Sequence, residues 1–390
     1  MSMEQVPVKG SLASAALCCT ARPYAEECAK IARMTSTRVV IVGAGPIGLE
    51  LAVALKQEGI DYLQFDQSSI GATIAWYPLQ MQFHSNAERL AIAGVAIQTA
   101  DQQKPTREEY LAYLRAVVLQ HDLQIRGYER VESITPIPEG RTPSSAQPRG
   151  SAAFAARADE DVRPSFEVRT SREVVRAEHV VIAIGSMHRP RLLDIPGEGL
   201  PHVAHYFREA HDYFGQRLVI IGGKNSAIEA AIRCQRAGAN VTLAYRKPDF
   251  DPAHVKFWLL PEIRSMVRDD RVRVMTSVAP AEIRSRSIIM QSTIDRSLVE
   301  LDADFVLMLT GYEQDTSLLE GAGVAFGGDA RVPHYDEETM ETNVPGLFLA
   351  GTAVQGSPVG RVREIVENCH VHVPRIVNAI RAASRRNVPA

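Results

Sequence analysis

Three glycines with a characteristic spacing stand early in the sequence. Gly43, Gly45 and Gly48 fit the pattern G-x-G-x-x-G, and Asp66 follows about 20 residues later. In such a turn the first glycine permits a tight bend, the second lets the backbone approach a pyrophosphate, and the third lets a helix pack closely on a strand. A helix N-terminus there would add N–H donors and positive potential, and Asp66 could accept hydrogen bonds from ribose hydroxyls. The spacing predicts a dinucleotide site; a strand-to-helix turn without a ligand is the alternative.

A second turn, further along the chain, departs from this pattern. The pair Gly222–Gly223 is present and Ala227 fills the last small position, but Lys224 stands where the middle glycine belongs. The strand that follows ends at Arg246 and Lys247, with no carboxylate. A cationic pair at this place suits a 2′-phosphate, so we expect NADP(H) rather than NAD(H). A nucleotide-free turn and a solvated strand end are the alternatives.

The sequence offers few groups for thiol or metal chemistry. It has five cysteines and no C-x-x-C. We expect Cys234 to be a small buried side chain, whereas Cys369 is the candidate redox thiol. His84 could supply the proton that a departing thiolate needs, because histidine titrates near neutrality; a hydrogen-bonded loop histidine is the alternative. His370 and His372 lie beside Cys369, but their spacing does not share a helical face, so we predict no metal site.

Alternating strands and helices must position these groups. Residues 38–42 predict a buried strand, residues 49–58 a helix and residues 60–65 a second strand, which together form a β-α-β unit. Residues 218–245 repeat this order. Three further apolar strands close on glycines, at Val180–Gly185, Phe305–Gly311 and Leu347–Gly351. The repetition predicts an α/β fold with two Rossmann-like, doubly wound dinucleotide-binding domains.

Length, composition and charge exclude several classes of protein. The chain has 390 residues and a formal net charge of −3. This near balance argues against a nucleic-acid binder, and no uncharged apolar run approaches the ~20 residues of a membrane span. Residues 1–35 lack the cationic start and long apolar core of a secretion signal. We therefore expect a cytoplasmic protein without nucleic-acid or membrane partners, in which residues 1–35 are a disordered extension.

In combination, the motifs resemble those of the thioredoxin-reductase-like flavoproteins, and more closely those of the bacillithiol-disulfide reductase family. The resemblance spans about Val39 to Arg381. Nine segments carry it: Gly43–Gly48, Thr73–Pro78, Phe83–Ser85, Pro196–Glu198, His205–Phe207, Gly222–Ser226, Thr310–Tyr312, Glu338–Asn343 and Glu367–Asn368. Lysine at position 224 is also found in that family.

The resemblance implies FAD on the first unit and NADPH on the second, with the NADPH domain inserted into the FAD domain. Residues 36–195 would form the first part of the FAD domain, with a loop insertion at about 136–165 that is rich in Pro, Ser, Ala and Gly. Residues 196–318 would form the NADPH domain, and residues 319–390 the second part of the FAD domain.

The resemblance also implies which residues contact the cofactors. Tyr77 and Phe83 stand where the family places its flavin-side loop, and Glu367 is placed near the flavin ring; ordinary packing and a surface helix are the respective alternatives. Thr352 replaces an acidic residue that binds the ribityl chain in many such enzymes. The cofactor-binding residues that we predict are Gly43, Gly45, Pro46, Ile47, Gly48, Asp66, Tyr77, Phe83, Gly222, Gly223, Lys224, Asn225, Ser226, Ala227, Arg246, Lys247, Gly311, Gly351, Thr352 and Glu367.

The implied activity is electron transfer from NADPH through flavin to a small-molecule acceptor, a low-molecular-weight disulfide such as bacillithiol disulfide. Members of that family often carry a cysteine in the first glycine loop, where this chain has Ile47, so a route through that thiol is closed. The alternatives are a flavin-dependent monooxygenase, whose usual Phe-x-Gly-x-x-x-His linker is absent, a ferredoxin or quinone reductase, and a nucleotide-sensing flavoprotein without catalysis. Homodimers are common in the family.

Overall fold

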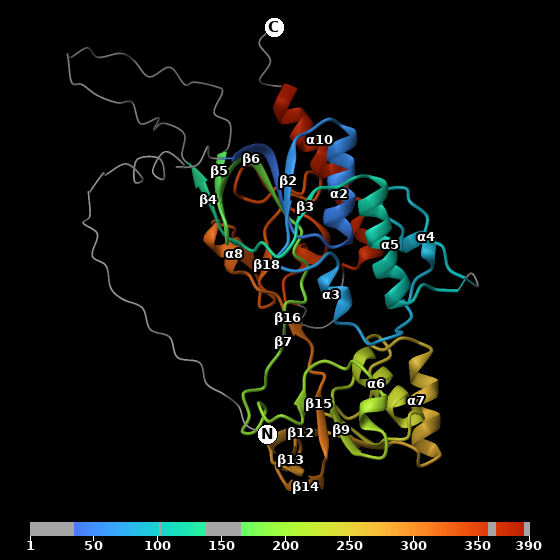
Figure 1. The fold of residues 1–390 in the computed structure, drawn as a ribbon. Coiled ribbons are helices and arrows are strands. Elements are labelled where there is room, and N and C mark those ends of the chain that lie inside the picture. Colours follow the sequence, from blue (N-terminus) through green and yellow to red (C-terminus); the bar gives the residue numbers. More distant parts are fainter. Residues whose placement is uncertain (1–34, 101–102, 138–164, 358–363, 386–390) are drawn as a thin grey trace, which may run out of the picture. The chain divides into compact units, whose positions relative to one another are not determined.

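The computed structural model describes residues 35–100, 103–137, 165–357 and 364–385. Residues 1–34 of the predicted extension and most of the predicted insertion at residues 136–165 lie outside these ranges, whereas Thr35, the last residue of the predicted extension, begins the first strand. Residues Ser36–Ala390 cluster as one compact unit. Their described part is a mixed α/β fold with several sheets (Figure 1). Among the described helices, none has both the length and the apolar character that crossing a bilayer requires.

The first sheet has seven strands and draws on both halves of the sequence. Its strands are β1 (Thr35–Val42), β2 (Tyr62–Phe65), β3 (Ile125–Arg126), β4 (Val131–Ile137), β5 (Ser165–Thr170), β6 (Val174–Ile182) and β19 (Leu347–Leu349). They lie in the order β3-β2-β1-β6-β5-β4, and β19 pairs in parallel with β6. The pairs β1–β2 and β2–β3 are parallel, whereas the pairs β4–β5 and β5–β6 are antiparallel.

Three long helices pack beside this sheet (Figure 1). They are α2 (Pro46–Gln57), α5 (Arg107–Gln120) and α10 (His372–Arg385). Helix α5 begins at a capping box in which Glu109 N–H donates to Thr106 Oγ1 and Thr106 N–H donates to the Glu109 carboxylate, so two otherwise unpaired amides are satisfied. It buries Tyr110, Leu114 and Val117, whose spacing places them on one helical face.

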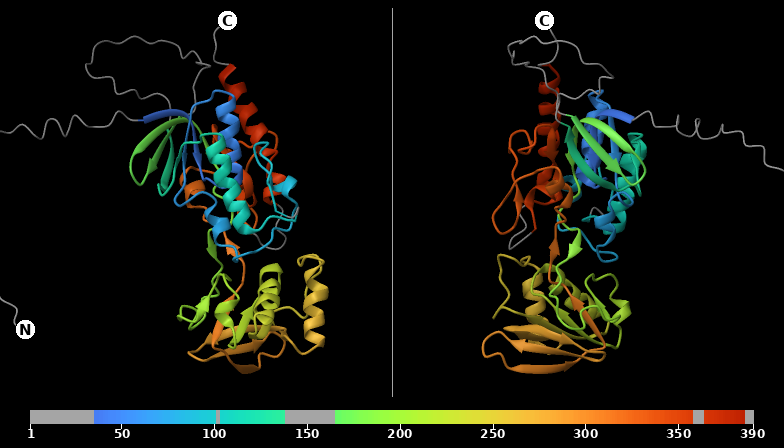
Figure 2. Two further views of the ribbon diagram at one scale, coloured as in Figure 1. Left: turned by 45° about the vertical axis from the view of Figure 1, so that its right-hand side comes forward. Right: turned by 90° about the vertical axis from the view of Figure 1, so that its left-hand side faces the viewer.

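The second sheet is built only from the middle of the chain. Its strands are β8 (Val203–Ala204), β9 (Arg217–Ile221), β10 (Asn240–Tyr245), β11 (Arg273–Thr276) and β15 (Phe305–Met308). They are parallel and lie in the order β11-β10-β9-β15-β8. Helices α6 (Asn225–Arg236) and α7 (Leu259–Arg268) pack against each other beside it, and β12 (Val278–Ile283), β13 (Ser287–Ser292) and β14 (Leu298–Asp302) form a separate antiparallel sheet (Figure 2).

The chain leaves the first sheet after β6 and returns to it at β19. The outgoing strand β7 (Arg189–Pro190) pairs antiparallel with the returning strand β16 (Tyr312–Glu313). The first sheet has a hydrophobic core that includes residues before β7 and residues after β16, whereas the two cores of the second sheet lie between these strands. The segment that forms the second sheet is therefore inserted between the two segments that form the first sheet.

Short elements complete the described chain: α3 (Ala72–Ala75), α4 (Ala87–Leu90), α8 (Ser317–Gly321), α9 (Val366–Cys369), the 3-10 helices η1 (His211–Tyr213) and η2 (Gly351–Gln355), and the strand pair β17 (Phe326–Gly327) and β18 (Val332–Pro333). Several boundaries differ from expectation. Strand β1 begins before residue 38, α2 begins before residue 49, and β2 begins after residue 60. The strand that we predicted at Val180–Gly185 begins earlier, at Val174, and ends at Ile182, because polar residues in its first half alternate with buried ones along a continuous ladder.

Candidate functional site

The first glycine loop runs from the end of β1 to the start of α2. Gly43 has φ +112°, and a Cβ there would lie 2.5 Å from the Ala183 oxygen; a Cβ on Gly48 would overlap the Gly43 oxygen. The fold itself therefore requires glycine at both positions. Gly45 is different: its φ of −76° suits any residue, and no atom lies within 4 Å of the place where its Cβ would be. The space in front of Gly45 fits a group that approaches the backbone closely, such as the pyrophosphate of FAD.

Asp66 follows β2 and faces this loop. One carboxylate oxygen accepts from Ala44 N–H at 2.7 Å, and the other accepts from Ser68 N–H at 2.8 Å. Burial raises the pKa of Asp66, although these two hydrogen bonds oppose the shift. Each oxygen keeps a further lone pair, so the carboxylate can still accept from ribose hydroxyls.

The second glycine loop, from β9 to α6, follows the same backbone path. Gly222 N–H donates to Ala244 as Gly43 N–H donates to Phe65, so Tyr245 occupies the position that Asp66 has in the first unit. The Tyr245 ring packs on Gly223, where a Cβ would overlap it. Lys224 is the N-cap of α6 with an extended backbone that needs no glycine. This loop is therefore built differently at the position where a second nucleotide would bind.

Positive charge gathers around the second loop. The pKa of Lys224 is lowered by burial and then by the charges of Lys247, Arg191 and Arg246, and Asp251 opposes the shift. Asp251 lies near these four cations, and Glu313 forms an ion pair with Arg191 at 3.6 Å. A phosphate dianion beside the loop would be attracted by the cations. Arg246 and Lys247 are exposed at the end of β10. We identified these two from the sequence but missed Arg191, which comes from the distant linker.

Other predicted residues of this loop have structural partners. Asn225 Oδ1 accepts from Lys256 N–H at 2.8 Å and so ties the segment before α7 to the start of α6. Ala227 is buried beneath Gly222. Ser226 lies in the first turn of α6, and Gly311, with φ +104°, has open space at its Cβ position.

The predicted flavin-side aromatics are partly buried against the first core. The ring centroids of Tyr77 and Phe83 are 6.1 Å apart, and those of Phe83 and Tyr110 are 4.7 Å apart. Burial raises the pKa of Tyr77, and the charge of Glu367 adds to the shift. Glu367, in α9, accepts a hydrogen bond from Ser85 Oγ. The structure thus brings together segments from the part of the chain before β7 and from the part after β16.

Two histidines that follow α9 form hydrogen bonds with neighbouring segments of the chain. His370 Nδ1 contacts the Glu50 carboxylate at 2.8 Å, and Nε2 donates to the Arg89 oxygen at 3.2 Å. A carbonyl only accepts, so Nε2 carries a proton, and Glu50 raises the pKa of the ring. His372 Nδ1 accepts from Gly351 N–H at 3.1 Å and is buried, which lowers its pKa to about 4.

The two described thiols are poor nucleophiles. Cys369 is 0% exposed, and burial together with Glu364 raises its pKa. Burial raises the pKa of Cys234 to about 12. Only the thiolate reacts, so neither cysteine is prepared for disulfide exchange at neutral pH. Potential ligand atoms of Glu364, Cys369 and His372 lie within 4.8 Å of one another, but His372 Nδ1 is already engaged by Gly351, and we propose no metal there.

The remaining predicted residues line the C-terminal side of the first loop. Ile47 is buried, and its side chain lies where a Cβ on Gly351 would reach it at 3.4 Å. Gly351 opens η2 with φ +67°, and Thr352 follows it. Thr352 Oγ1 lies 3.5 Å from the Cβ position of Gly185, at the end of the strand segment that we predicted from the sequence. Pro46 is the first residue of α2.

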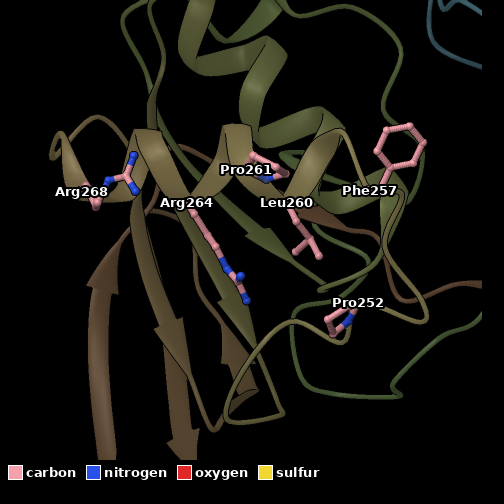
Figure 3. Close-up of a pocket in the computed structure, with 6 residues that line it drawn as sticks. All are labelled: Pro252, Phe257, Leu260, Pro261, Arg264 and Arg268. Carbon is pink, nitrogen blue, oxygen red and sulfur yellow. The ribbon is translucent and has the colours of Figure 1, made fainter.

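A shallow groove of about 480 Å³ lies on α7 and the segment before it. It is lined by Pro252, Phe257, Leu260, Pro261, Arg264 and Arg268. Figure 3 shows Arg264 and Arg268 extending from the helix and Phe257 standing in the segment before it. The groove contains none of the residues that we predicted to bind a cofactor.

Comparison with known proteins places the chain in a family. Residues 40–142 and 159–351 match the model of the pyridine nucleotide-disulphide oxidoreductases. Bacilliredoxin reductase Bdr of Bacillus subtilis (strain 168) is 34% identical over 354 residues, which cover 91% of this chain and 100% of the relative. The solved structure of bacillithiol disulfide reductase Bdr from Bacillus cereus is 32% identical, with a TM-score of 0.78, and covers 90% of this chain and 100% of that one.

A more distant structure shows how far the fold extends. Thioredoxin reductase of T. acidophilum is 19% identical with a TM-score of 0.65, covering 90% of this chain and 99% of that one, and shares the fold. These findings confirm the resemblance seen in the motifs. The chain belongs to the pyridine nucleotide-disulphide oxidoreductase family, which implies FAD and NAD(P)H, and it is a flavoprotein oxidoreductase that is similar to Bdr and shares the fold of thioredoxin reductase.

Proposed function

We propose that this enzyme passes two electrons from NADPH to a low-molecular-weight disulfide, with FAD held on the first glycine loop and NADPH on the second. Residues 36–195 and 319–390 would form the FAD domain, and residues 196–318 the NADPH domain inserted in it. In the overall reaction, NADPH, one proton and one disulfide give NADP⁺ and two thiols. FAD, when bound, supplies the carrier that accepts the two electrons from the nicotinamide and delivers them to the acceptor.

One observation carries the assignment of the two nucleotides: the loops have opposite charge. The first presents Asp66, which suits the free ribose hydroxyls of FAD. The second has Tyr245 at the equivalent position. It is surrounded by Lys224, Arg246 and Lys247, whose charges suit the 2′-phosphate of NADPH, a group that NADH lacks.

Residues of the first domain have distinct tasks toward FAD. The backbone around Gly45 and the start of α2 would bind the pyrophosphate. Gly351 and Thr352 would lie along the ribityl chain, with the turn held by His372. Tyr77, Phe83 and Glu367 would border the ring and exclude water from it. These roles follow the family resemblance together with the positions of the side chains.

We expect the disulfide to be reduced without a thiol from the part of the chain that the structure describes. Ile47 stands at the glycine-loop position where relatives often have a cysteine, and the two described thiols, Cys234 and Cys369, are buried with raised pKa values. In this proposal the acceptor reaches the flavin itself. His84 lies in the flavin-side loop and would carry the proton that the departing thiolate takes up.

The test is a steady-state screen of purified, FAD-loaded enzyme with NADPH and a panel of acceptors: bacillithiol disulfide, oxidised bacilliredoxin, glutathione disulfide, ferredoxin and a quinone. Rapid, multiple turnover with a disulfide and two thiols formed per NADPH would support the proposal. Turnover confined to ferredoxin or the quinone would contradict the disulfide assignment. Oxygen consumption matched by an oxygenated product would instead indicate a monooxygenase.

A further inference from the structure

The Trp258 ring is the centre of a positively charged group whose two lysines have no part in the roles above. Lys104 Nζ lies 5.0 Å from its centroid and Lys256 Nζ lies 5.9 Å from it. The His84 ring is 5.3 Å away, centroid to centroid. We call His84, Lys104, Lys256 and Trp258 the Trp258 cluster. Ammonium groups over an indole face are held by the ring quadrupole, and the ring also offers an apolar surface.

Both halves of the cluster are anchored by backbone contacts. His84 and Lys104 come from two neighbouring segments, joined where Phe83 N–H donates to the Pro105 oxygen at 2.9 Å and where Gln82 bridges Thr106. The other half is anchored through Lys256 N–H, which donates to Asn225 Oδ1 at 2.8 Å. The side chains therefore project from fixed backbone rather than from free loops.

Among the described residues, no carboxylate forms an ion pair with the two lysines of the cluster. Burial lowers the pKa of His84, and Lys256 and Lys104 lower it further, while Glu367 is the one group that opposes them. Within the described ranges, neither lysine forms an ion pair or a side-chain hydrogen bond; their contacts are those with Trp258. Two ammonium groups beside a buried histidine repel, and an anion placed between them would be stabilised.

The cluster is distinct from the cations that we assign to NADPH. The groups that act on Lys224 are Lys247, Arg191, Arg246 and Asp251. The groups that act on His84 are Lys256, Lys104 and Glu367. The two sets share no member, and the second set acts on His84, the proposed proton carrier of the flavin-side loop. The anion it suits is therefore the acceptor rather than the 2′-phosphate.

We propose that the Trp258 cluster is the binding site of the electron acceptor and selects disulfides that carry carboxylate groups. Lys104 and Lys256 bind the carboxylates, the Trp258 ring covers the apolar part of the acceptor, and the disulfide lies beside His84. Phe257 is 81% exposed and its ring centroid lies 4.8 Å from that of Trp258, so it extends the aromatic surface. This inference rests on the proposed disulfide reductase activity and adds the charge class of its substrate.

The test compares two disulfides of similar size in the FAD-loaded enzyme. One is 5,5′-dithiobis(2-nitrobenzoate), with two carboxylates; the other is 4,4′-dithiodipyridine, which is uncharged at neutral pH. In Lys104→Gln/Lys256→Gln, the ratio of kcat/KM for the anionic over the neutral disulfide should fall about tenfold, mostly through KM of the anionic one. The matched control, Arg284→Gln/Arg286→Gln, removes two exposed cations between β12 and β13, in a segment that contributes nothing to the cluster, and should keep the wild-type ratio.

Binding of a redox-inert dicarboxylate, 4,4′-biphenyldicarboxylate, separates this inference from the proposed function. Calorimetry should detect binding to the wild type and about tenfold weaker binding to the lysine double variant. Two results in the lysine double variant would overturn the acceptor site. One is an unchanged ratio of kcat/KM between the anionic and the neutral disulfide; the other is a KM for NADPH that rises as much as KM for the anionic disulfide. If the dicarboxylate binds through the lysines but no disulfide is turned over, the site stands and the disulfide reductase activity fails.

Discussion

The two glycine loops share a backbone path but differ in what they require of their residues. In the first, Gly43 and Gly48 are imposed by the fold, whereas Gly45 is left open in front of α2. In the second, Lys224 takes the place of Gly45 and Tyr245 takes that of Asp66. The path is thus set by strand and helix packing, and in the proposed function the few side chains that the path leaves free select the nucleotide.

The largest effect is expected at Gly45. In Gly45→Val, the new side chain suits the backbone dihedrals and meets no protein atom, so the apo-protein should fold with an unchanged Tm. Bound FAD would overlap it, and FAD affinity should fall about 100-fold. Fluorescence titration of apo-protein with FAD measures this. Gly43→Val is the contrasting control and should lower Tm strongly, because its Cβ meets the Ala183 oxygen. Unchanged FAD affinity in Gly45→Val would refute the pyrophosphate site.

The next effect tests the charge of the second loop. Arg246→Ala/Lys247→Ala removes two of the cations around Lys224, so KM for NADPH should rise about tenfold or more while KM for NADH changes little. Steady-state kinetics with both coenzymes and one acceptor checks it. Equal increases for the two coenzymes would show that this pair does not bind the 2′-phosphate.

A smaller effect distinguishes the helices that follow the loops. Glu50 in α2 and Glu229 in α6 occupy equivalent positions, two residues after Gly48 and Ala227. Glu50 pairs with His370 of the distant C-terminal segment, whereas Glu229 pairs with Arg233 of its own helix at 3.8 Å. Burial raises the pKa of Glu229. The first helix is thus joined to the C-terminal segment by an ion pair that the second lacks.

His370→Gln should therefore change stability in a pH-dependent way. The raised pKa of His370 means that the pair stabilises the fold below the ordinary histidine pKa and loses this contribution as pH rises through the raised value. We expect a loss of about 1 kcal/mol at pH near 6 and a smaller loss at pH near 9, measured by urea unfolding. Arg233→Gln, the control on the second helix, should show no such decrease between these two pH values. A pH-independent loss in His370→Gln would exclude the charged pair.

The smallest effect concerns the thiols. Cys369→Ala and Cys234→Ala should keep kcat/KM for a disulfide within about twofold, because both thiols are buried with raised pKa values. Both substitutions should instead lower the free energy of unfolding, because each removes packed atoms from the core. A loss of disulfide turnover with normal flavin reduction in Cys369→Ala would mean that this thiol carries electrons after all.

Local patterns in the sequence predicted the parts of the fold that depend on neighbouring residues. The strands on either side of Gly43 and Gly222, the helices that follow and the cationic end of β10 all lie within short segments, so periodicity and spacing reveal them. The start of β6 was predicted less accurately. Its first half contains exposed and half-buried polar residues, which interrupt the apolar run in the sequence but not the ladder of hydrogen bonds.

Features that join distant segments could not be predicted in this way. Arg191 reaches the second loop from the linker, and Glu50 meets His370 across most of the sequence. The Trp258 cluster combines residues from three separate segments; the run Lys256-Phe257-Trp258 is a local signal that aromatic and cationic groups gather there, but it does not identify Lys104 as their neighbour. Such contacts depend on tertiary packing, which no spacing rule encodes.

The most direct test of the two-nucleotide account is an anaerobic titration of the yellow, FAD-loaded protein, followed by its visible absorbance. The account predicts that one equivalent of NADPH reduces the flavin rapidly and that NADH does so at least about tenfold more slowly at equal concentration. Addition of a disulfide should then restore the oxidised spectrum. A colourless protein that does not take up added FAD, or a flavin that NADH reduces as fast as NADPH, would contradict it.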